Sequence, residues 1–114
     1  MVEYSQSALD DIFGALAHPA RRSMLARLTR GDATVSELAE PFAMSFAAVS
    51  KHVSVLERAA LVRREVVGRE HHLRLNPTAL REAAEWVERH RRFWEERLDS
   101  LERFLTDKRK RSRT

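Results

Sequence analysis

The stretch SELAEPFAMSFAAVSKHVSVLERAALVRREVVGREHHLRLNP, residues 36–77, decides the fold of this 114-residue chain. Just before and within it, Thr34 stands three residues ahead of Glu37, the spacing of a capping box, which predicts the start of a short helix. Pro41 lies late in that helix and should shorten or kink its last turn. The inward face of this helix is expected to consist of Leu38, Ala39 and Phe42.

A second helix is predicted over Phe46–Arg58, with Ser45 as its N-cap. Three apolar residues recur at helical spacing and should be buried: Val49, Val53 and Leu56. The opposite face carries small and hydrogen-bonding residues: Ala47, Ser50, Lys51 and Ser54. Such a face is able to approach another molecule closely and to donate hydrogen bonds to it.

Two β-like runs follow, Leu61–Val67 and Glu70–Leu75, joined by Gly68-Arg69. They predict a two-stranded hairpin. Its cations in the strands are Arg63, Arg64 and Arg74, and Arg69 stands at the turn. A helix, a short turn, a helix and a basic hairpin, in that order, are typical of a winged helix-turn-helix that binds DNA.

Outside this stretch, helices are predicted over Ser7–Ala17, with Ser7 as N-cap, and over Pro19–Thr29, with Pro19 at the first position. A long last helix of about 28 residues, ~42 Å, is predicted to start at Asn76-Pro77, with Asn76 as its cap. The expected fold is therefore mainly α with a small β-hairpin, comprising about five helices and a two-stranded wing.

The last helix carries a heptad seam that is interrupted by a single charged residue, Arg91. For Arg91 we expect either a snorkelling side chain or an ion pair with an acid such as Glu88 or Glu95. The seam consists of Leu80, Ala84, Val87, Arg91, Trp94, Leu98, Leu101 and Leu105. So small a domain cannot cover a face of that length, so a second copy of the chain is the expected cover.

Positive charge is concentrated in two segments. Residues 45–75 carry six basic and three acidic groups, and the tail 108–114 (KRKRSRT) carries five basic groups and no acid, whereas residues 1–44 and 76–107 each have a net charge of −2. A polyanionic partner such as DNA fits this distribution.

Several function classes find no support. There is no cysteine, no Gly-rich phosphate loop and no Ser/His/Asp grouping, so we expect no catalytic site, no cofactor and no thiolate metal site. The absence of cysteine fits a reducing cytoplasm. Neither a signal-like N-terminus nor an apolar run of membrane-spanning length is present, so a cytoplasmic location without membrane contact is expected.

The chain resembles the ArsR/SmtB family of winged-helix repressors over residues 8–105. The resemblance rests on His18-Pro19-Ala20-Arg21, on Ser50-Lys51-His52, on the run Val55–Ala59 with Leu61-Val62, and on Gly68-Arg69 at the wing. It implies a homodimer built from the first and last helices, two recognition helices on an inverted repeat, and repression by promoter occlusion. It places DNA contacts on Phe46, Ala47, Ser50, Lys51 and Arg69. A small-molecule inducer is an expected further partner.

This sequence departs from the family pattern in two ways. The family often has Gly where this chain has Ala60, and a left-handed conformation there would cost Ala roughly 1 kcal/mol. The last helix offers only Glu85, Glu88 and His90 as metal ligands, and His90 points away from the other two. His71 and His72, adjacent in a strand, face opposite sides. The chain therefore resembles the metal-independent members.

Residues 1–107 are thus expected to form one DNA-binding and dimerisation domain, and 108–114 a disordered basic tail. The expected DNA contacts are Phe46, Ala47, Ser50, Lys51, Ser54, Arg63 and Arg69. The expected dimer contacts are Leu9, Phe13, Val87, Trp94, Leu98 and Leu101. Two alternatives stay open, namely a protein-interaction module that uses the long helix, and a metal-sensing repressor that uses His90 with nearby carboxylates.

Overall fold

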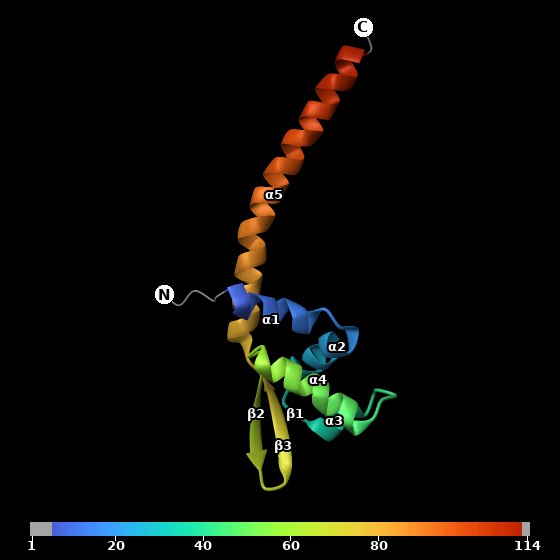
Figure 1. Cartoon of the computed structure of the whole chain (residues 1–114), viewed down its shortest axis with the longest axis vertical. Coiled ribbons are helices and arrows are strands. Elements are labelled where there is room, and N and C mark those ends of the chain that lie inside the picture. The colour runs from blue at the N-terminus through green and yellow to red at the C-terminus, as the bar shows by residue number, and fades with distance from the viewer. Residues whose placement is uncertain (1–5, 113–114) are drawn as a thin grey trace. The chain divides into compact units, whose positions relative to one another are not determined.

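The computed structural model describes residues 6–112, and the chain divides after Ala83 into two compact units. The first unit contains four helices and a small antiparallel sheet (Figure 1). Its elements are α1 (Gln6–Leu16), α2 (Pro19–Leu28), β1 (Ala33–Thr34), α3 (Val35–Ala39), α4 (Phe46–Arg58), β2 (Val62–Val67) and β3 (Glu70–Leu75). Helix α5 (Pro77–Ser112) starts in this unit, and its continuation from Ala84 forms the second unit.

The helices follow the local sequence signals closely. The capping box at α3 is formed, with Thr34 Oγ1 accepting from the Glu37 N–H at 3.1 Å and Glu37 Oε1 accepting from the Thr34 N–H at 3.2 Å. Helix α3 ends at Ala39, so Pro41 shortens it as predicted. The prediction that Ser7 caps the first helix is wrong, because α1 already includes Gln6 and Ser7 lies within the helix.

The sheet has three strands in the order β1-β3-β2, where the sequence predicted a two-stranded hairpin. β2 and β3 pair from Val62 opposite Leu75 to Val67 opposite Glu70. The added strand is only two residues long, with Ala33 opposite Leu73 and Thr34 opposite His72. Two residues are too few to show the alternation by which a strand is predicted, so only the tertiary structure brings β1 to the sheet.

A single hydrophobic core holds the first unit together. Its completely or almost completely buried large side chains are Ile12, Met24, Leu38, Val49, Val53, Leu56, Leu61 and Leu73. They come from all four helices, from β3 and from the residue before β2, and each contributes roughly 1.5–3 kcal/mol by leaving water. Ala79 and Ala83 at the start of α5 join the core, where small side chains let that helix approach closely. The core thereby fixes the orientation of α4 and of the hairpin base.

The turn after α4 adopts an unusual backbone conformation. Ala60 has φ +59°, in the left-handed region, at the position where the family pattern favours glycine. The Leu61 N–H donates to the Leu56 carbonyl at 3.0 Å, and the buried Asn76 side-chain amide donates to the Ala60 carbonyl at 2.8 Å. These two hydrogen bonds hold Ala60 in a conformation that costs an L-residue about 1–2 kcal/mol.

Helix α5 is longer than the sequence predicted, at 36 residues where about 28 were expected. The structure also differs from the expected boundary at residue 107, because the helix runs on through Lys108, Arg109 and Lys110 to Ser112. Lys and Arg are good helix formers, and no Gly or Pro interrupts this segment. Residues 113–114 of the expected tail lie outside the described residues. Within residues 6–112 no helix is both long enough and apolar enough to span a membrane.

Candidate nucleic-acid interface

Helix α4 is oriented by its buried side and presents its polar side to solvent. Ser45 Oγ accepts from the Ala48 N–H at 3.1 Å and caps the helix as predicted. The residues expected inside, Val49, Val53 and Leu56, are all 0% exposed. On the opposite side Phe46, Ala47, Lys51 and Ser54 are exposed and Ser50 is half-buried. The helix therefore offers one uncharged N-terminal turn followed by hydroxyl groups and a single lysine.

The hairpin presents its cations in different ways. Arg63 and Arg69 are exposed, and Gly68, with φ +63°, supplies the left-handed turn that joins the strands. Arg74 forms an exposed ion pair with Asp32, with 3.2 Å between Nε and Oδ2. Arg63 and Arg69 are thus the wing cations best placed to meet phosphate.

Arg64 has a structural role that sequence reasoning did not assign. Its guanidinium binds both carboxylate oxygens of Glu57 on α4, with 3.2 Å between Nε and Oε2. Its Nη1 also donates to His71 Nδ1 at 3.0 Å. Because a two-point arginine–carboxylate contact restricts both partners, Arg64 ties the hairpin to α4. The sequence signal was weak, an acid late in one helix and a basic residue early in the next strand.

A groove of about 330 Å³ lies where α4, the start of α3 and the hairpin meet. It is lined by Thr34, Val35, Ser36, Phe46, Ser50, Arg64, Arg69, Glu70 and His71. Two expected DNA contacts on the helix, Phe46 and Ser50, therefore face the same concavity as Arg69 of the wing. The arrangement suits an elongated partner that touches both the helix and the hairpin.

A second junction holds the side of α4 that carries His52. The His18 Nδ1 accepts from the Ala20 N–H at 3.1 Å and caps α2. Arg21 donates to the Ala15 carbonyl at 2.7 Å, and its Nη1 donates to His52 Nδ1 at 3.2 Å. The rings of His18 and His52 are 4.5 Å apart. Partial burial, with the positive charges of neighbours including Arg21 and Lys51, lowers the pKa of His52. Sequence reasoning noted the His18–Arg21 motif without finding this junction.

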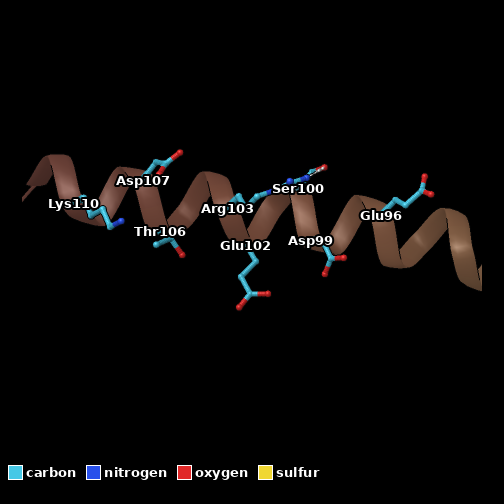
Figure 2. Close-up of a pocket in the computed structure, with 8 residues that line it drawn as sticks. All are labelled: Glu96, Asp99, Ser100, Glu102, Arg103, Thr106, Asp107 and Lys110. Carbon is cyan, nitrogen blue, oxygen red and sulfur yellow. Dashed lines mark hydrogen bonds between the residues drawn. The ribbon is translucent and has the colours of Figure 1, made fainter.

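The second unit consists of one helix with two distinct sides. Large apolar side chains along one side are about half exposed: Val87 47%, Phe93 49%, Trp94 61%, Leu98 59%, Leu101 52%, Phe104 62% and Leu105 49%. Figure 2 shows eight other residues of the same helix, Glu96, Asp99, Ser100, Glu102, Arg103, Thr106, Asp107 and Lys110, which form a polar surface. All eight project from one helix, so they form one polar side of α5.

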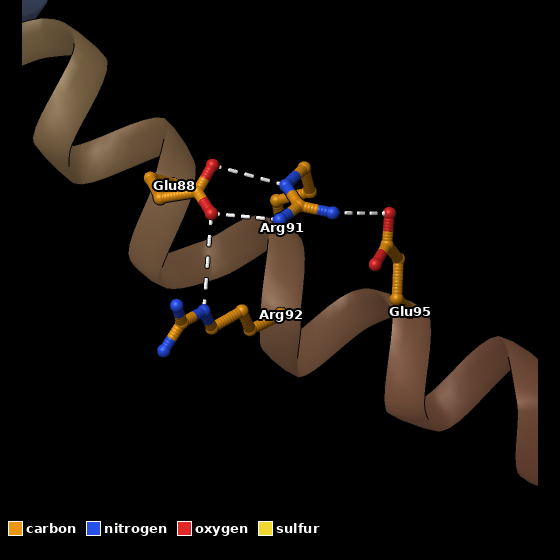
Figure 3. A network of polar contacts seen from close by, with 4 residues as sticks. All are labelled: Glu88, Arg91, Arg92 and Glu95. Atoms are coloured by element: carbon orange, nitrogen blue, oxygen red, sulfur yellow. Dashed lines mark hydrogen bonds and ion pairs between the residues drawn. The ribbon is translucent and has the colours of Figure 1, made fainter.

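Arg91 forms ion pairs, one of the two roles expected for it from the sequence (Figure 3). Its Nη2 lies 2.7 Å from Glu88 Oε1 and its Nη1 lies 2.6 Å from Glu95 Oε1. Arg92 is 3.8 Å from the same Glu88 oxygen. The hydrogen bond from Arg91 lowers the pKa of the Glu88 carboxyl. Arg91 therefore lies in a local charge network and keeps its charge beside the apolar seam.

The structure also places the expected dimer contacts on α1 and the candidate metal ligand His90. On α1, Leu9 is buried and Phe13 is half-buried against the core. His90 stacks on Trp86 with ring centroids 3.9 Å apart, and its Nδ1 donates to the Trp86 carbonyl at 2.8 Å. Over residues 6–112, no three His, Asp or Glu side chains come together as a metal site would require.

Comparison with known proteins identifies the family. A family profile described as a helix-turn-helix domain matches residues 16–65, from the end of α1 into β2. The transcriptional repressor SdpR of Bacillus subtilis (strain 168) is 30% identical over 79 residues, 69% of this chain and 88% of SdpR. The crystal structure of an ArsR family transcriptional regulator has a TM-score of 0.76 at 36% identity, over 82% of this chain and 97% of its own. The chain belongs to the ArsR family.

Further ArsR-type structures support the same assignment. An ArsR-like transcriptional regulator from Rhodococcus sp. RHA1 has a TM-score of 0.72 at 32% identity, over 86% of this chain and 92% of its own. The ArsR family consists of DNA-binding transcriptional regulators and not of enzymes, and the winged helix-turn-helix fold predicted from residues 36–77 is confirmed. α4 is accordingly the recognition helix and β2–β3 the wing.

Proposed function

We propose that this ArsR-family protein is a homodimeric repressor that binds an inverted-repeat operator through two copies of α4. The observation that carries the proposal is the groove shared by Phe46 and Ser50 of the recognition helix and Arg69 of the wing. A helix that enters the major groove reads base edges with its N-terminal residues, and an adjacent arginine meets the sugar–phosphate backbone. The proposed DNA contacts are Phe46, Ala47, Ser50, Lys51, Ser54, Arg63 and Arg69.

The proposed dimer rests on the apolar side of α5. Seven large side chains there are 47–62% exposed, more contiguous apolar surface than a single helix keeps in water without a partner. Four of them, Trp94, Leu98, Leu101 and Leu105, follow one another at spacings of four, three and four residues, which fits a second helix of the same kind. The proposed contacts are Leu9, Phe13, Val87, Trp94, Leu98 and Leu101, with the α5 residues contributing most, because Leu9 is already buried in its own protomer.

Sedimentation across a concentration series tests the dimer. We expect Leu98→Glu to shift the protein to monomer, because a charge would have to enter the apolar contact. Thr106→Glu is the matched control, since it adds the same charge to the polar surface of the same helix and should leave the dimer intact. A wild-type monomer that pairs only with a foreign helix would favour the protein-interaction module instead.

Fluorescence anisotropy on the protein's own upstream DNA and on scrambled DNA tests operator binding. Lys51→Ala should weaken binding to the specific DNA by about 1–3 kcal/mol if Lys51 donates to a guanine edge. Binding to scrambled DNA serves as the internal control, because a phosphate contact would weaken both. Equal loss on both DNAs, or no loss, removes Lys51 from base readout.

The basic C-terminal segment is proposed to contact phosphate. Residues 108–114 carry five cationic groups and no acid. Each phosphate contact adds about 0.9 to the slope of log affinity against log salt. Deleting residues 108–114 should therefore weaken binding to all DNA sequences alike and reduce that slope. A truncated protein with the full-length slope would exclude phosphate contact by this segment.

A further inference from the structure

The first unit exposes few large apolar side chains, and one of them, Phe46, is a proposed DNA contact. Among its described residues, 6–83, these are Phe46 at 59%, Val66 at 56% and Val67 at 57%. The two valines are in the strand that leads to the wing turn. Phe46 is the first residue of α4, where Ser45 caps the helix and fixes the direction in which its first turn projects.

The ring of Phe46 is not itself a partner for phosphate. The neighbours in its turn are Ser45, Ala47 and Ala48, so no charged side chain stands beside the ring in that turn. Ser50, one turn further, lines the same groove as Phe46, as expected for residues four apart on a helix. A phenyl ring neither donates nor accepts a conventional hydrogen bond, so it gains most by covering another apolar group.

In the major groove only one base-edge group is apolar, the C5-methyl group of thymine. We propose that Phe46 determines sequence specificity by packing against a thymine C5-methyl group in each operator half-site, next to the base pair that Ser50 addresses. The inference rests on the proposed operator binding. Beyond operator binding, the inference names thymine as one base of each half-site and its C5-methyl group as the atom group that Phe46 contacts.

The test begins with selection of an operator from random double-stranded DNA by the full-length protein. Each thymine of a half-site is then replaced by deoxyuridine, which removes only the methyl group and keeps base pairing. For one thymine we expect the wild type to lose about threefold to fivefold in affinity per half-site. This is the effect of losing one buried apolar carbon from the contact. Phe46→Ala should bind the thymine and deoxyuridine operators equally well.

Two further variants make the comparison specific. Phe46→Leu keeps an apolar side chain and should retain part of the deoxyuridine penalty. Val66→Ala removes an exposed apolar side chain from the wing and should keep the whole deoxyuridine penalty.

A change to the DNA tests the same contact. Placing 5-methylcytosine at the sensitive position should give tighter wild-type binding than cytosine does, because the methyl group is restored. Circular dichroism confirms folding, which truncation of so exposed a ring should leave intact.

The outcomes separate this inference from the function on which it rests. An equal deoxyuridine penalty in the wild type and in Phe46→Ala, or no sensitive thymine at all, overturns the role of Phe46 while operator binding stands. Failure of the protein to select any sequence overturns both.

Discussion

Ala60 allows a direct test of the turn that joins the recognition helix to the wing. It is the sole non-glycine residue with positive φ in residues 6–112, at φ +59°. A left-handed conformation costs an L-residue about 1–2 kcal/mol, whereas glycine adopts it freely. Replacement by glycine also raises the entropy of the unfolded chain, which offsets about 0.4–1 kcal/mol of that gain. Ala60 is exposed, so its methyl group contributes little burial.

The substitution Ala60→Gly should therefore raise the free energy of unfolding by about 0.5–1 kcal/mol, or the Tm by about 2–6 °C. Thermal and denaturant unfolding followed by circular dichroism measure this, at one fixed protein concentration because the stability of the proposed dimer would depend on concentration. The matched control is Ala26→Gly at an exposed position inside α2, which should cost about 1 kcal/mol. If Ala60→Gly is as destabilising as Ala26→Gly, residue 60 is not left-handed in solution and the reasoning fails.

Two further predictions concern the junctions that hold α4. Because the pKa of His52 is lowered in the folded state, the unfolded chain binds more protons, so the free energy of unfolding should fall as pH falls below about 6.5. His52→Gln should flatten the pH–stability profile in that acidic range, and an unchanged profile would contradict the assignment. Arg64→Ala should weaken binding to specific DNA with little change in dimerisation, because the wing loses its two-point contact with Glu57. Arg63 does not contact Glu57, so a parallel Arg63→Ala variant should instead reduce the slope of log DNA affinity against log salt concentration. If Arg64→Ala reduced that slope and Arg63→Ala did not, the two roles would be reversed.

The sequence predicted the elements whose signals are local. The capping box at Thr34 and Glu37, the Ser45 cap and the spacing of Val49, Val53 and Leu56 depend only on neighbours along one helix, and each matches the structure. The Arg91 ion pairs were predictable for the same reason, since residues three and four apart on a helix meet whatever the rest of the fold does. The order of two capped helices and a basic hairpin predicted the winged helix-turn-helix, and the family resemblance agreed with it.

The tertiary structure alone decided what depends on residues far apart in the sequence. Ala33 and Thr34 become a third strand only because β3 lies beside them. Arg21 meets His52, 31 residues away, and Asn76 holds the Ala60 carbonyl from 16 residues away. No spacing rule along the sequence predicts such pairs. They form because packing brings two surfaces together, and the polar groups buried there need hydrogen-bond partners. The sequence by itself thus determined which helices form and which faces they bury, and the packed structure determined how α4 is held and which cations remain free for a partner.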